Sequence, residues 1–220
     1  MLRVSVIITN YNYGRFLGRC IRSVLAQSFP SDAFEAIVVD DGSTDESRKV
    51  IESFGDKVRA IYLPTNHGVA YASNAGVKAS RGMYVIRIDA DDYISFRTLD
   101  VLLLFLEENK DKSFAYCDHT RVNILDQREE RINLDTEEKL LDHGAGVLFK
   151  KTVLEAIGLY DEEMLNCEDL LLIKKLLRNG FEGIHVSLPL YRYMRHGANM
   201  TEDKASRDAW KQKAEGKISQ

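Results

Sequence analysis

The sequence predicts an α/β fold built on a mostly parallel, Rossmann-like central sheet with helices on both faces. Short runs rich in β-branched residues alternate with amphipathic runs through about the first 90 residues, and enough chain for a helix separates each pair of strand-like runs. Strands joined in this way need crossover connections, which favour parallel pairing. A chain of 220 residues, 45% of them hydrophobic, buries such a core without disulfides or a metal.

The expected strands of the first half are residues 4–9, 36–40, 58–63 and 84–89, where Val and Ile recur. Each run is short and is followed by polar residues. A parallel sheet is therefore expected to bring its polar strand ends to one edge.

Three helices are expected between these strands. Apolar side chains from Phe16 to Leu25 recur at helical spacing and predict one buried stripe. The second helix is expected to begin at Ser43, because Glu46 follows three residues later in a capping-box pattern. The third is expected over residues 69–79.

The regular alternation ends after Asp92. A Leu-rich helix is expected over residues 98–108, and the polar stretch 118–135 is expected to hold a hairpin. A further helix is predicted over residues 168–178, where Asn179-Gly180 provides a C-terminal stop. The remaining expected strands are residues 114–117 and 183–187.

Composition and charge exclude several classes of protein. Lys and Arg number 30 against 34 Asp and Glu, a net charge of -4, so nucleic acid is not expected as a partner. The longest apolar run, residues 101–106, is far shorter than the roughly 20 residues of a transmembrane helix. The N-terminus lacks the features of a signal peptide, which predicts a cytoplasmic protein. Three widely spaced cysteines, Cys20, Cys117 and Cys167, suggest neither a disulfide framework nor a zinc cluster.

Polar clusters follow three of the expected strands, at residues 9–12, 40–43 and 89–92. Ligands of open parallel sheets bind beyond the carboxyl ends of the strands. The two acidic clusters bring five carboxylates to this edge, and a bound cation is the simplest compensation for their repulsion.

The residues of these clusters suit a metal-bound nucleotide. Asp89 and Asp91 are two apart on an extended chain, so both carboxylates can address one ion, and hard oxygen ligands favour Mg²⁺ or Mn²⁺. Such an ion leaves positions for the phosphate oxygens of a nucleoside diphosphate. Tyr11 is expected to stack on a base, and Asp40 or Asp41 to accept a hydrogen bond from a base N–H.

These three motifs resemble those of the inverting family 2 glycosyltransferases with the GT-A fold. The matching stretches are residues 4–12, 38–45 and 89–92, which resemble the family's nucleotide-binding and DXD motifs in order and spacing. The resemblance implies that Thr9, Tyr11 and one Asp of the 40/41 pair bind the nucleoside. It also implies that Asp91, with Asp89 beside the nucleotide, handles an Mn²⁺ or Mg²⁺ ion and the diphosphate.

The resemblance continues through the second half. Residues 144–169 are similar to the family's acceptor region, which implies that Asp169 is the general base and that Glu168 supports it. The segment 191–199 resembles the family's closing segment, which implies that His196 meets the metal or diphosphate.

One nucleotide-binding segment departs from the family. Many relatives read Ala-Arg-Asn before a Gly where this chain has Ala72-Ser73-Asn74, so Asn74 matches and a cation is missing. Arg81 and Arg87 are the alternatives for replacing that cation.

The resemblance also predicts organisation and activity. It implies one GT-A domain over residues 1–220, with a nucleotide-sugar-binding half at 1–95, an acceptor-binding half with a smaller sheet at 96–200, and a C-terminal helix or tail at 201–220. The implied reaction is metal-dependent, inverting transfer of a hexosyl or N-acetylhexosaminyl group to a hydroxyl acceptor. The donor is expected to be a nucleoside diphosphate sugar, a UDP-sugar foremost, and the acceptor a glycan or a lipid-linked sugar.

Alternatives remain at this stage. A non-catalytic nucleotide-sugar-binding module would bind the donor without turnover. A phosphoacceptor signalling domain would place an acidic pair after its first strand, where Thr9-Asn10 stands. The charged segment 202–220 is expected to be solvated, contact with the inner face of a membrane being the less favoured reading. The sugar, the linkage and the oligomeric state are left open.

Overall fold

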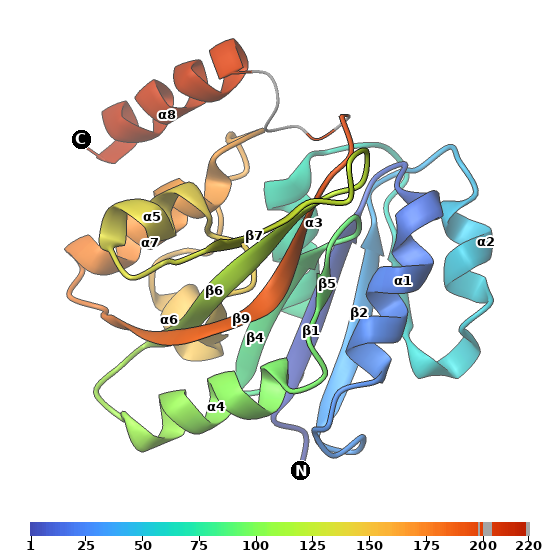
Figure 1. The fold of residues 1–220 in the computed structure, drawn as a ribbon, viewed down its shortest axis with the longest axis horizontal. Helices are drawn as coiled ribbons and strands as arrows, with labels where there is room; N and C mark the ends of the chain where they lie inside the picture. The colour runs from blue at the N-terminus through green and yellow to red at the C-terminus, as the bar shows by residue number, and fades with distance from the viewer. Residues whose placement is uncertain (198, 200–203, 219–220) are drawn as a thin grey trace.

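The structure is a computed structural model that describes residues 1–197, 199 and 204–218. Its described residues form one sheet of nine strands with helices on both faces (Figure 1). The order is β3-β2-β1-β4-β8-β6-β9-β5, and β7 pairs with β6 outside this path. The predicted α/β class is confirmed, but the sheet is mixed rather than mostly parallel, because the strands of the second half add antiparallel pairs.

The first half is a parallel four-stranded unit. Its strands are β1 (Val4–Asn10), β2 (Phe34–Asp40), β3 (Arg59–Tyr62) and β4 (Tyr84–Asp89), close to the predicted ranges. Within it β1 pairs with both β2 and β4, so Thr9 lies opposite Asp89 in the register. The polar strand ends therefore share one edge, as expected.

The helices α1 (Gly14–Leu25) and α3 (Val69–Ala79) occupy the predicted stretches. The prediction for the second helix is wrong, because α2 runs from Ser47 to Glu52 and the 3₁₀ helix η1 (Gly55–Lys57) follows it. The hydroxyl of Ser43 donates to Asp40 and accepts from the backbone N–H of Asn12 instead of capping a helix. Local hydrogen bonds to the strand end thus outcompete the capping box.

The second half extends the same sheet. The short strand β8 (Leu148–Lys150) pairs antiparallel with both β4 and β6 (Phe114–Asn123), and β6 continues the sheet to β9 (Gly183–Arg195). Both β6 and β9 are longer than predicted. Strands β5 (Tyr93–Ile94) and β7 (Glu129–Ile132) complete the edge, and β6 with β7 forms the predicted hairpin. The acceptor-side strands therefore join the first sheet rather than forming a separate one.

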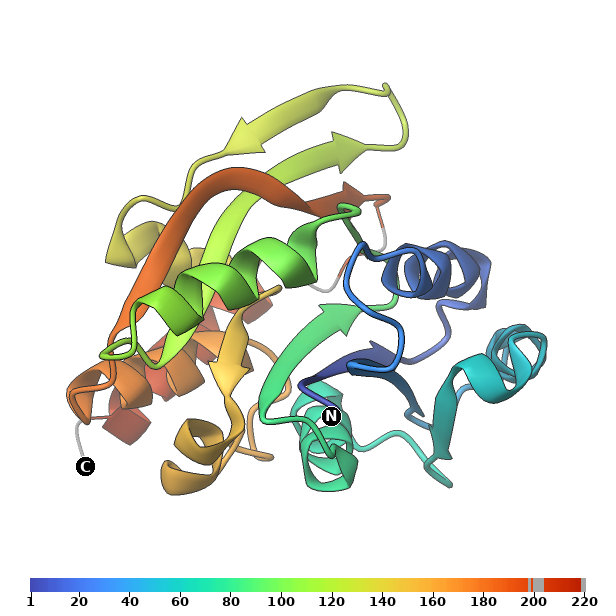
Figure 2. The ribbon, with the colours of Figure 1, turned by 90° about the horizontal axis from the view of Figure 1, so that it is seen from below.

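Two apolar clusters cover the two faces of the sheet. One contains α1 and α4 (Thr98–Glu108), and the other contains α3, α6 (Lys151–Ala156) and α7 (Glu168–Arg178). Figure 2 shows the sheet curling, so that β9 and the β6–β7 hairpin arch over α4. The predicted bounds of α4 and α7 are confirmed.

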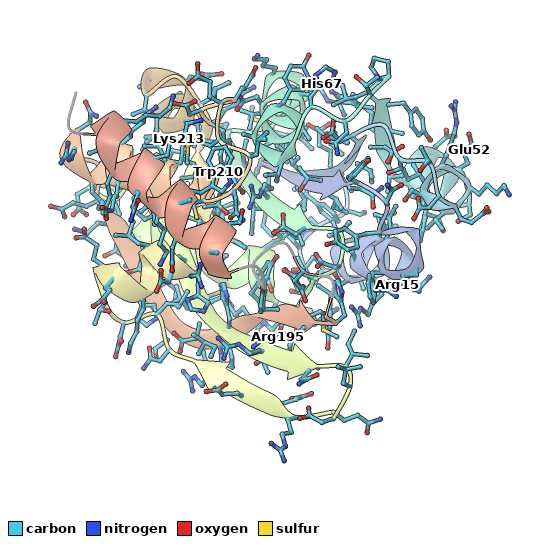
Figure 3. All side chains as sticks on the ribbon, turned by 90° about the horizontal axis from the view of Figure 1, so that it is seen from above. Arg15, Glu52, His67, Arg195, Trp210 and Lys213 are labelled. Carbon is cyan, nitrogen blue, oxygen red and sulfur yellow. The ribbon has the colours of Figure 1, made fainter. Side chains whose placement is uncertain are left out.

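The C-terminal helix α8 (Lys204–Ile218) packs on α7 through a small cluster that includes Leu171, Trp210 and Ala214. It falls within the predicted tail 201–220, of which residues 201–203 and 219–220 lie outside the described residues. Seen from above, α8 crosses one end of the molecule, with Arg195 at the end of β9 on one side and His67 beyond the other (Figure 3). Among the described residues, no helix is long and apolar enough to span a membrane.

Candidate active site

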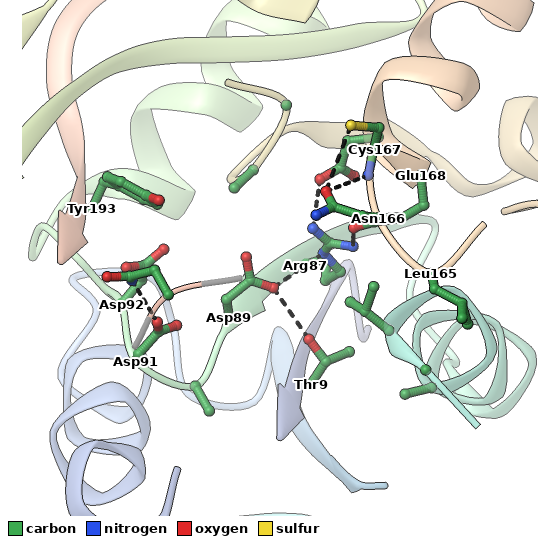
Figure 4. A pocket seen from close by; sticks show the side chains of 18 of the residues that line it. Thr9, Arg87, Asp89, Asp91, Asp92, Leu165, Asn166, Cys167, Glu168 and Tyr193 are labelled. Atoms are coloured by element: carbon green, nitrogen blue, oxygen red, sulfur yellow. Dashed lines mark hydrogen bonds and ion pairs between the residues drawn. The ribbon is translucent and has the colours of Figure 1, made fainter. Parts of the chain in front are cut away.

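A cavity of about 690 Å³ opens at the carboxyl ends of β1 and β4 (Figure 4). Its lining comes from both halves of the chain: the polar strand ends of the first half, the segment 165–170 at the start of α7, and the ends of β6 and β9. Of the predicted site residues, it brings together Thr9, Tyr11, Asp41, Asp89, Asp91, Glu168 and Asp169. Residues from distant parts of the chain therefore share one pocket.

The acidic cluster after β4 is crowded and poorly hydrated. Burial and the nearby charge of Asp89 raise the pKa of Asp91. Burial and the charges of Asp91 and Asp89 raise the pKa of Asp92 well above its usual range. Asp92 is held by Tyr191, whose hydroxyl donates at 2.6 Å. The cluster thus carries more negative charge than its surroundings neutralise.

His196 reaches this cluster from the segment after β9. Its Nε2 lies 2.9 Å from Asp91 Oδ2, and the side-chain amide of Asn199 donates to the same oxygen at 3.2 Å. The imidazole stacks on Phe16 with ring centroids 4.6 Å apart, which fixes its plane. His196 therefore lies beside Asp91, and its contact with a metal or diphosphate stays a prediction.

The donor set fits a hard divalent ion with open coordination positions. Among the described residues, no group of three His, Cys, Asp or Glu side chains is arranged to enclose an ion. Asp91 and Asp89 supply carboxylate oxygens, and His196 supplies an imidazole nitrogen beside Asp91. The raised pKa values in the cluster indicate that added positive charge would be favourable there. Mg²⁺ or Mn²⁺ held by few protein groups takes its remaining ligands from phosphate oxygens and water.

Arg87 joins the donor edge to the start of α7. Its Nη1 donates to Glu168 at 2.7 Å, its Nη2 donates to Asp169 at 2.5 Å, and its Nε lies 3.5 Å from Asp89. The side chain is 6% exposed, and its guanidinium lies 5.5 Å from the ring centroid of Tyr160. One buried cation therefore holds three carboxylates from two halves of the chain.

The carboxylate of Asp169 has properties that suit proton transfer. Burial raises its pKa to about 7, against the opposing effect of Arg87. Gly144 lies against it, because a Cβ at Gly144 would be 2.5 Å from the Asp169 Cβ. Asp169 is thus placed by contacts from two sides, with a pKa near neutrality that is typical of a general base.

The two Asp residues after β2 have different roles. Both carboxylate oxygens of Asp41 accept backbone hydrogen bonds, from His67 at 2.9 Å and Gly68 at 2.8 Å, and Asp41 lines the cavity. Asp40 instead accepts from the side chain of Asn10 at 2.8 Å and is absent from the cavity lining. The geometry thus favours Asp41 over Asp40 as the residue beside a bound base. Tyr11, 42% exposed, lines the same end of the cavity.

Thr9 and Asn74 contribute differently from each other. The Thr9 hydroxyl donates to Asp89 at 3.2 Å inside the cavity. Asn74 is buried outside the cavity lining, where it exchanges hydrogen bonds with the backbone of Tyr160 at 2.9 and 3.0 Å and donates to Glu162. Asn74 therefore ties α3 to the segment before α7 rather than facing the predicted nucleotide site.

Arg87, rather than Arg81, is the cation near the predicted site, since Arg81 pairs with Glu35. A signal for it was present in the sequence, because Arg87 stands two residues before Asp89 and so shares its strand face. The sequence analysis also missed several cavity residues of the second half, namely His119, Arg121, His143, Tyr193, Arg207 and Lys211. His119, Arg121 and Tyr193 lie on parts of β6 and β9 beyond the predicted bounds, and Arg207 and Lys211 reach the cavity through the docking of α8, which the sequence did not indicate.

Comparisons with known proteins place the chain among glycosyltransferases. An uncharacterized glycosyltransferase of Nostoc sp. is 50% identical over 95 residues, which are 41% of this chain and 29% of the relative. The poly(ribitol-phosphate) beta-N-acetylglucosaminyltransferase TarS of Staphylococcus aureus is 34% identical over 112 residues, which are 50% of this chain and 20% of TarS. The chain spans less than a third of the length of either relative.

Solved structures share the fold. The structure of TarS residues 1-349 in complex with UDP-GlcNAc matches with a TM-score of 0.80 at 23% identity, covering 92% of this chain and 61% of that one. The mannosyltransferase PcManGT from Pyrobaculum calidifontis, in complex with GDP-Man and Mn²⁺, matches with a TM-score of 0.72 at 20% identity, covering 93% and 59%. These likenesses confirm the expected GT-A fold.

The family profile described as "Glycosyl transferase family 2" matches residues 5–158, which include all three polar strand ends. With most of its length matched in this way, the chain belongs to glycosyl transferase family 2.

Proposed function

We propose that the chain is a metal-dependent, inverting glycosyltransferase that moves a hexosyl or N-acetylhexosaminyl group from a nucleoside diphosphate sugar to a hydroxyl acceptor. The observation that carries this proposal is the shared cavity, in which the acidic donor edge and Asp169 are joined by Arg87. A binding module needs no near-neutral buried carboxylate beside its ligand, whereas a transferase needs a base there.

The donor occupies the edge formed by β1, β2 and β4. Tyr11 stacks on the base, and Asp41 stands beside it at the N-terminus of α3. Thr9 and Asp89 lie between the nucleoside and the diphosphate of the bound donor. The hydrogen bond from the Thr9 hydroxyl to Asp89 links these two positions. A UDP-sugar is the proposed donor; the TarS complex with UDP-GlcNAc supports this choice, while the PcManGT complex with GDP-Man leaves GDP-sugars as the second class to test.

Asp91, Asp89 and His196 are the residues that hold Mn²⁺ or Mg²⁺. When bound, the ion neutralises the diphosphate and stabilises it as a leaving group. The PcManGT complex with Mn²⁺ and the crowded carboxylates of this chain both support this part of the proposal.

Asp169 acts as the general base in a single displacement. It takes the proton of the acceptor hydroxyl as that oxygen attacks C1 of the sugar on the face opposite the diphosphate. The new C1–O bond forms while the bond from C1 to the diphosphate oxygen breaks, so the configuration at C1 inverts. Glu168 supports Asp169 because both carboxylates bind Arg87. The positive charge of Arg87 offsets the repulsion among Glu168, Asp169 and Asp89.

The acceptor enters from the second half of the chain, where the cavity is lined by β6, β9 and the segment after α5. A glycan or a lipid-linked sugar in polysaccharide biosynthesis is the proposed class. The proposed location is the cytoplasm, and the inner face of the membrane where the acceptor is lipid-linked.

The direct test is nucleotide release. Purified protein is incubated with UDP- and GDP-sugars, Mn²⁺ and candidate acceptors, and the released nucleotide is measured. Asp91→Ala and Asp169→Ala are expected to abolish turnover, and Asp169→Ala is expected to keep UDP binding by calorimetry. Asp111→Ala removes an exposed carboxylate outside the cavity, which pairs with Lys112, and serves as the matched control.

Two outcomes contradict the proposal. Equal rates of nucleotide release by the wild type and by Asp169→Ala would exclude Asp169 as the general base. Donor binding without turnover by any acceptor tested would favour a non-catalytic nucleotide-sugar-binding module.

A further inference from the structure

Four cations line the part of the cavity that the second half of the chain forms. We call it the basic wall and define it by Arg121, Arg195, Arg207 and Lys211, all of which line the cavity. They come from β6, β9 and α8. Asp142 is the carboxylate that lines the cavity on this side. The pocket is therefore polarised, with acids at the donor edge and cations on the acceptor side.

The register of β6 and β9 brings two of these cations to the same sheet face. Arg121 is paired with Tyr193, and Asn123 is paired with Arg195, in a parallel ladder. Because side chains two apart on a strand share a face, Arg121 and Arg195 are diagonal neighbours on the face that lines the cavity. The adjacent pair on that face, His119 and Tyr191, has ring centroids 4.8 Å apart.

The other two cations come from one face of α8. Arg207 and Lys211 are four residues apart, and both contact the carboxylate of Asp142. Two positive charges thus share one negative charge. Arg121 pairs with Glu130 at 3.1 Å, but the Glu130 side chain is 65% exposed, so solvent screens that pair.

The cations converge on the end of α5 (Glu137–Asp142). Arg207 and Lys211 contact Asp142, the last residue of α5, and burial together with the charges of Arg121 and Arg207 lowers the pKa of the next residue, His143. His143 precedes Gly144, the residue that lies against Asp169. The basic wall therefore contacts Asp142, two residues before the glycine that lies against the proposed base.

Two buried polar atoms of this side have no hydrogen-bond partner among the described residues. They are Nδ1 of His119 and Nε of Arg121. Burial lowers the pKa of His119 to about 3, so its ring is neutral at physiological pH. Leaving a buried polar group without a partner is unfavourable, and both of these residues line the cavity.

We propose that the acceptor carries an anionic group, a phosphate or a carboxylate, which the basic wall binds while the attacking hydroxyl faces Asp169. The inference rests on the proposed function, because it assigns the acceptor class of the same site. Repulsion from the donor-edge carboxylates reinforces the orientation, because an anionic group of the acceptor is favoured beside the cations of the basic wall.

The test is calorimetric binding to protein loaded with UDP and Mn²⁺. Three probes of similar length are compared: an oligo(glycerol phosphate), an oligosaccharide with alternating glucuronate residues, and neutral chitotetraose. At least one anionic probe is expected to bind about tenfold more tightly than the neutral one, and its affinity is expected to fall with added salt. Whether the phosphate or the carboxylate probe binds identifies the anionic group.

Variants locate the binding. Arg121→Gln and Lys211→Gln are each expected to lower the affinity for the anionic probe about fivefold or more. Arg121→Lys is expected to retain most of the affinity. The control is Arg128→Gln, which removes a positive charge from the same hairpin. The Arg128 side chain is 86% exposed, and this substitution is expected to leave the affinity for the anionic probe unchanged. Unfolding curves confirm that each variant is folded.

Three results would overturn the inference: equal binding of neutral and anionic probes, no binding of either anionic probe, or equal affinities for Arg121→Gln and Arg128→Gln. Failure to bind UDP in the loading step contradicts the proposed function instead. The two failures are therefore distinguishable.

Discussion

The guanidinium of Arg87 donates to the carboxylate of Asp169 across 2.5 Å, joining the end of β4 to the first turn of α7. The Arg87 side chain is buried and that of Asp169 is partly buried, and Glu168 and Asp89 contact the same guanidinium. Three carboxylates this close would otherwise raise one another's pKa and separate. The arginine thus sets the distance between the donor edge and the proposed base.

Arg87→Lys tests this role. A lysine keeps the charge but cannot address three carboxylates with a planar fork of donors. We expect kcat to fall by about 10- to 100-fold, because a small misplacement of the base is costly, while UDP affinity changes by less than about twofold. The measurements are steady-state kinetics and calorimetry with UDP and Mn²⁺.

The matched control is Arg81→Lys. Arg81 pairs with Glu35 at 2.9 Å on the surface, outside the cavity, and is 67% exposed. We expect wild-type kcat from this variant. A parallel loss of UDP affinity and kcat in Arg87→Lys would instead assign Arg87 to the donor.

Most of the fold follows from sequence periodicity. The bounds of α3, α4 and α7 were predicted to the residue, because apolar spacing and end signals agreed there. The strand β8 was missed because its three residues carry no period of their own. It exists because its backbone pairs with strands on both sides, which is a tertiary effect.

The site residues could be predicted from the sequence where they follow the end of a strand. The placement of Asp89 and Asp91 follows from the end of β4. The position of Asn74 could not be read in this way, because only its burial against Tyr160 turns it from the cavity. The basic wall could not be predicted from the sequence for a similar reason: it depends on the β6–β9 register and on where α8 docks.

The activity is expected to depend on pH through Asp169. Burial raises the pKa of its carboxyl to about 7. Only the ionised form accepts a proton, so activity is present above that pH and is lost as pH falls through it. We expect an acid limb in kcat/KM with a midpoint at or below about 7, since a bound divalent ion favours the carboxylate.

Asp169→Asn is the check on this assignment. It is expected to lower kcat by about 10² to 10⁴ and to remove the acid limb from any remaining activity. An unchanged acid limb in this variant would assign the titration to another group.

The neighbours Asp91 and Asp92 are expected to respond differently to the same substitution. Asp91→Asn removes a charge from the proposed metal site and is expected to abolish the Mn²⁺-dependent gain in UDP affinity. Asp92→Asn keeps an oxygen for the backbone N–H of Met194 and a polar group for Tyr191, so that gain is expected to persist. Calorimetry with UDP, with and without MnCl₂, measures both. A gain retained in Asp91→Asn would move the metal site elsewhere.

Gly144→Ala is expected to impair catalysis through contact alone. A Cβ at Gly144 would lie 2.5 Å from the Asp169 Cβ and 3.1 Å from Cδ1 of Ile173, so the first turn of α7 must shift. A displacement of about 1 Å at a reacting group lowers kcat by about 10²-fold, whereas overpacking destabilises by about 1–3 kcal/mol. We therefore expect kcat to fall by far more than the modest loss of stability, measured by urea unfolding, can explain.

Gly216→Ala is the control for adding a methyl group. Gly216 lies in α8, and an added Cβ there meets no heavy atom within 4 Å. The substitution is expected to leave kcat unchanged and to stabilise the helix by up to about 1 kcal/mol. If Gly144→Ala turned over as fast as Gly216→Ala, the close contact between residues 144 and 169 would not position the base, and the general-base assignment would need another carboxylate.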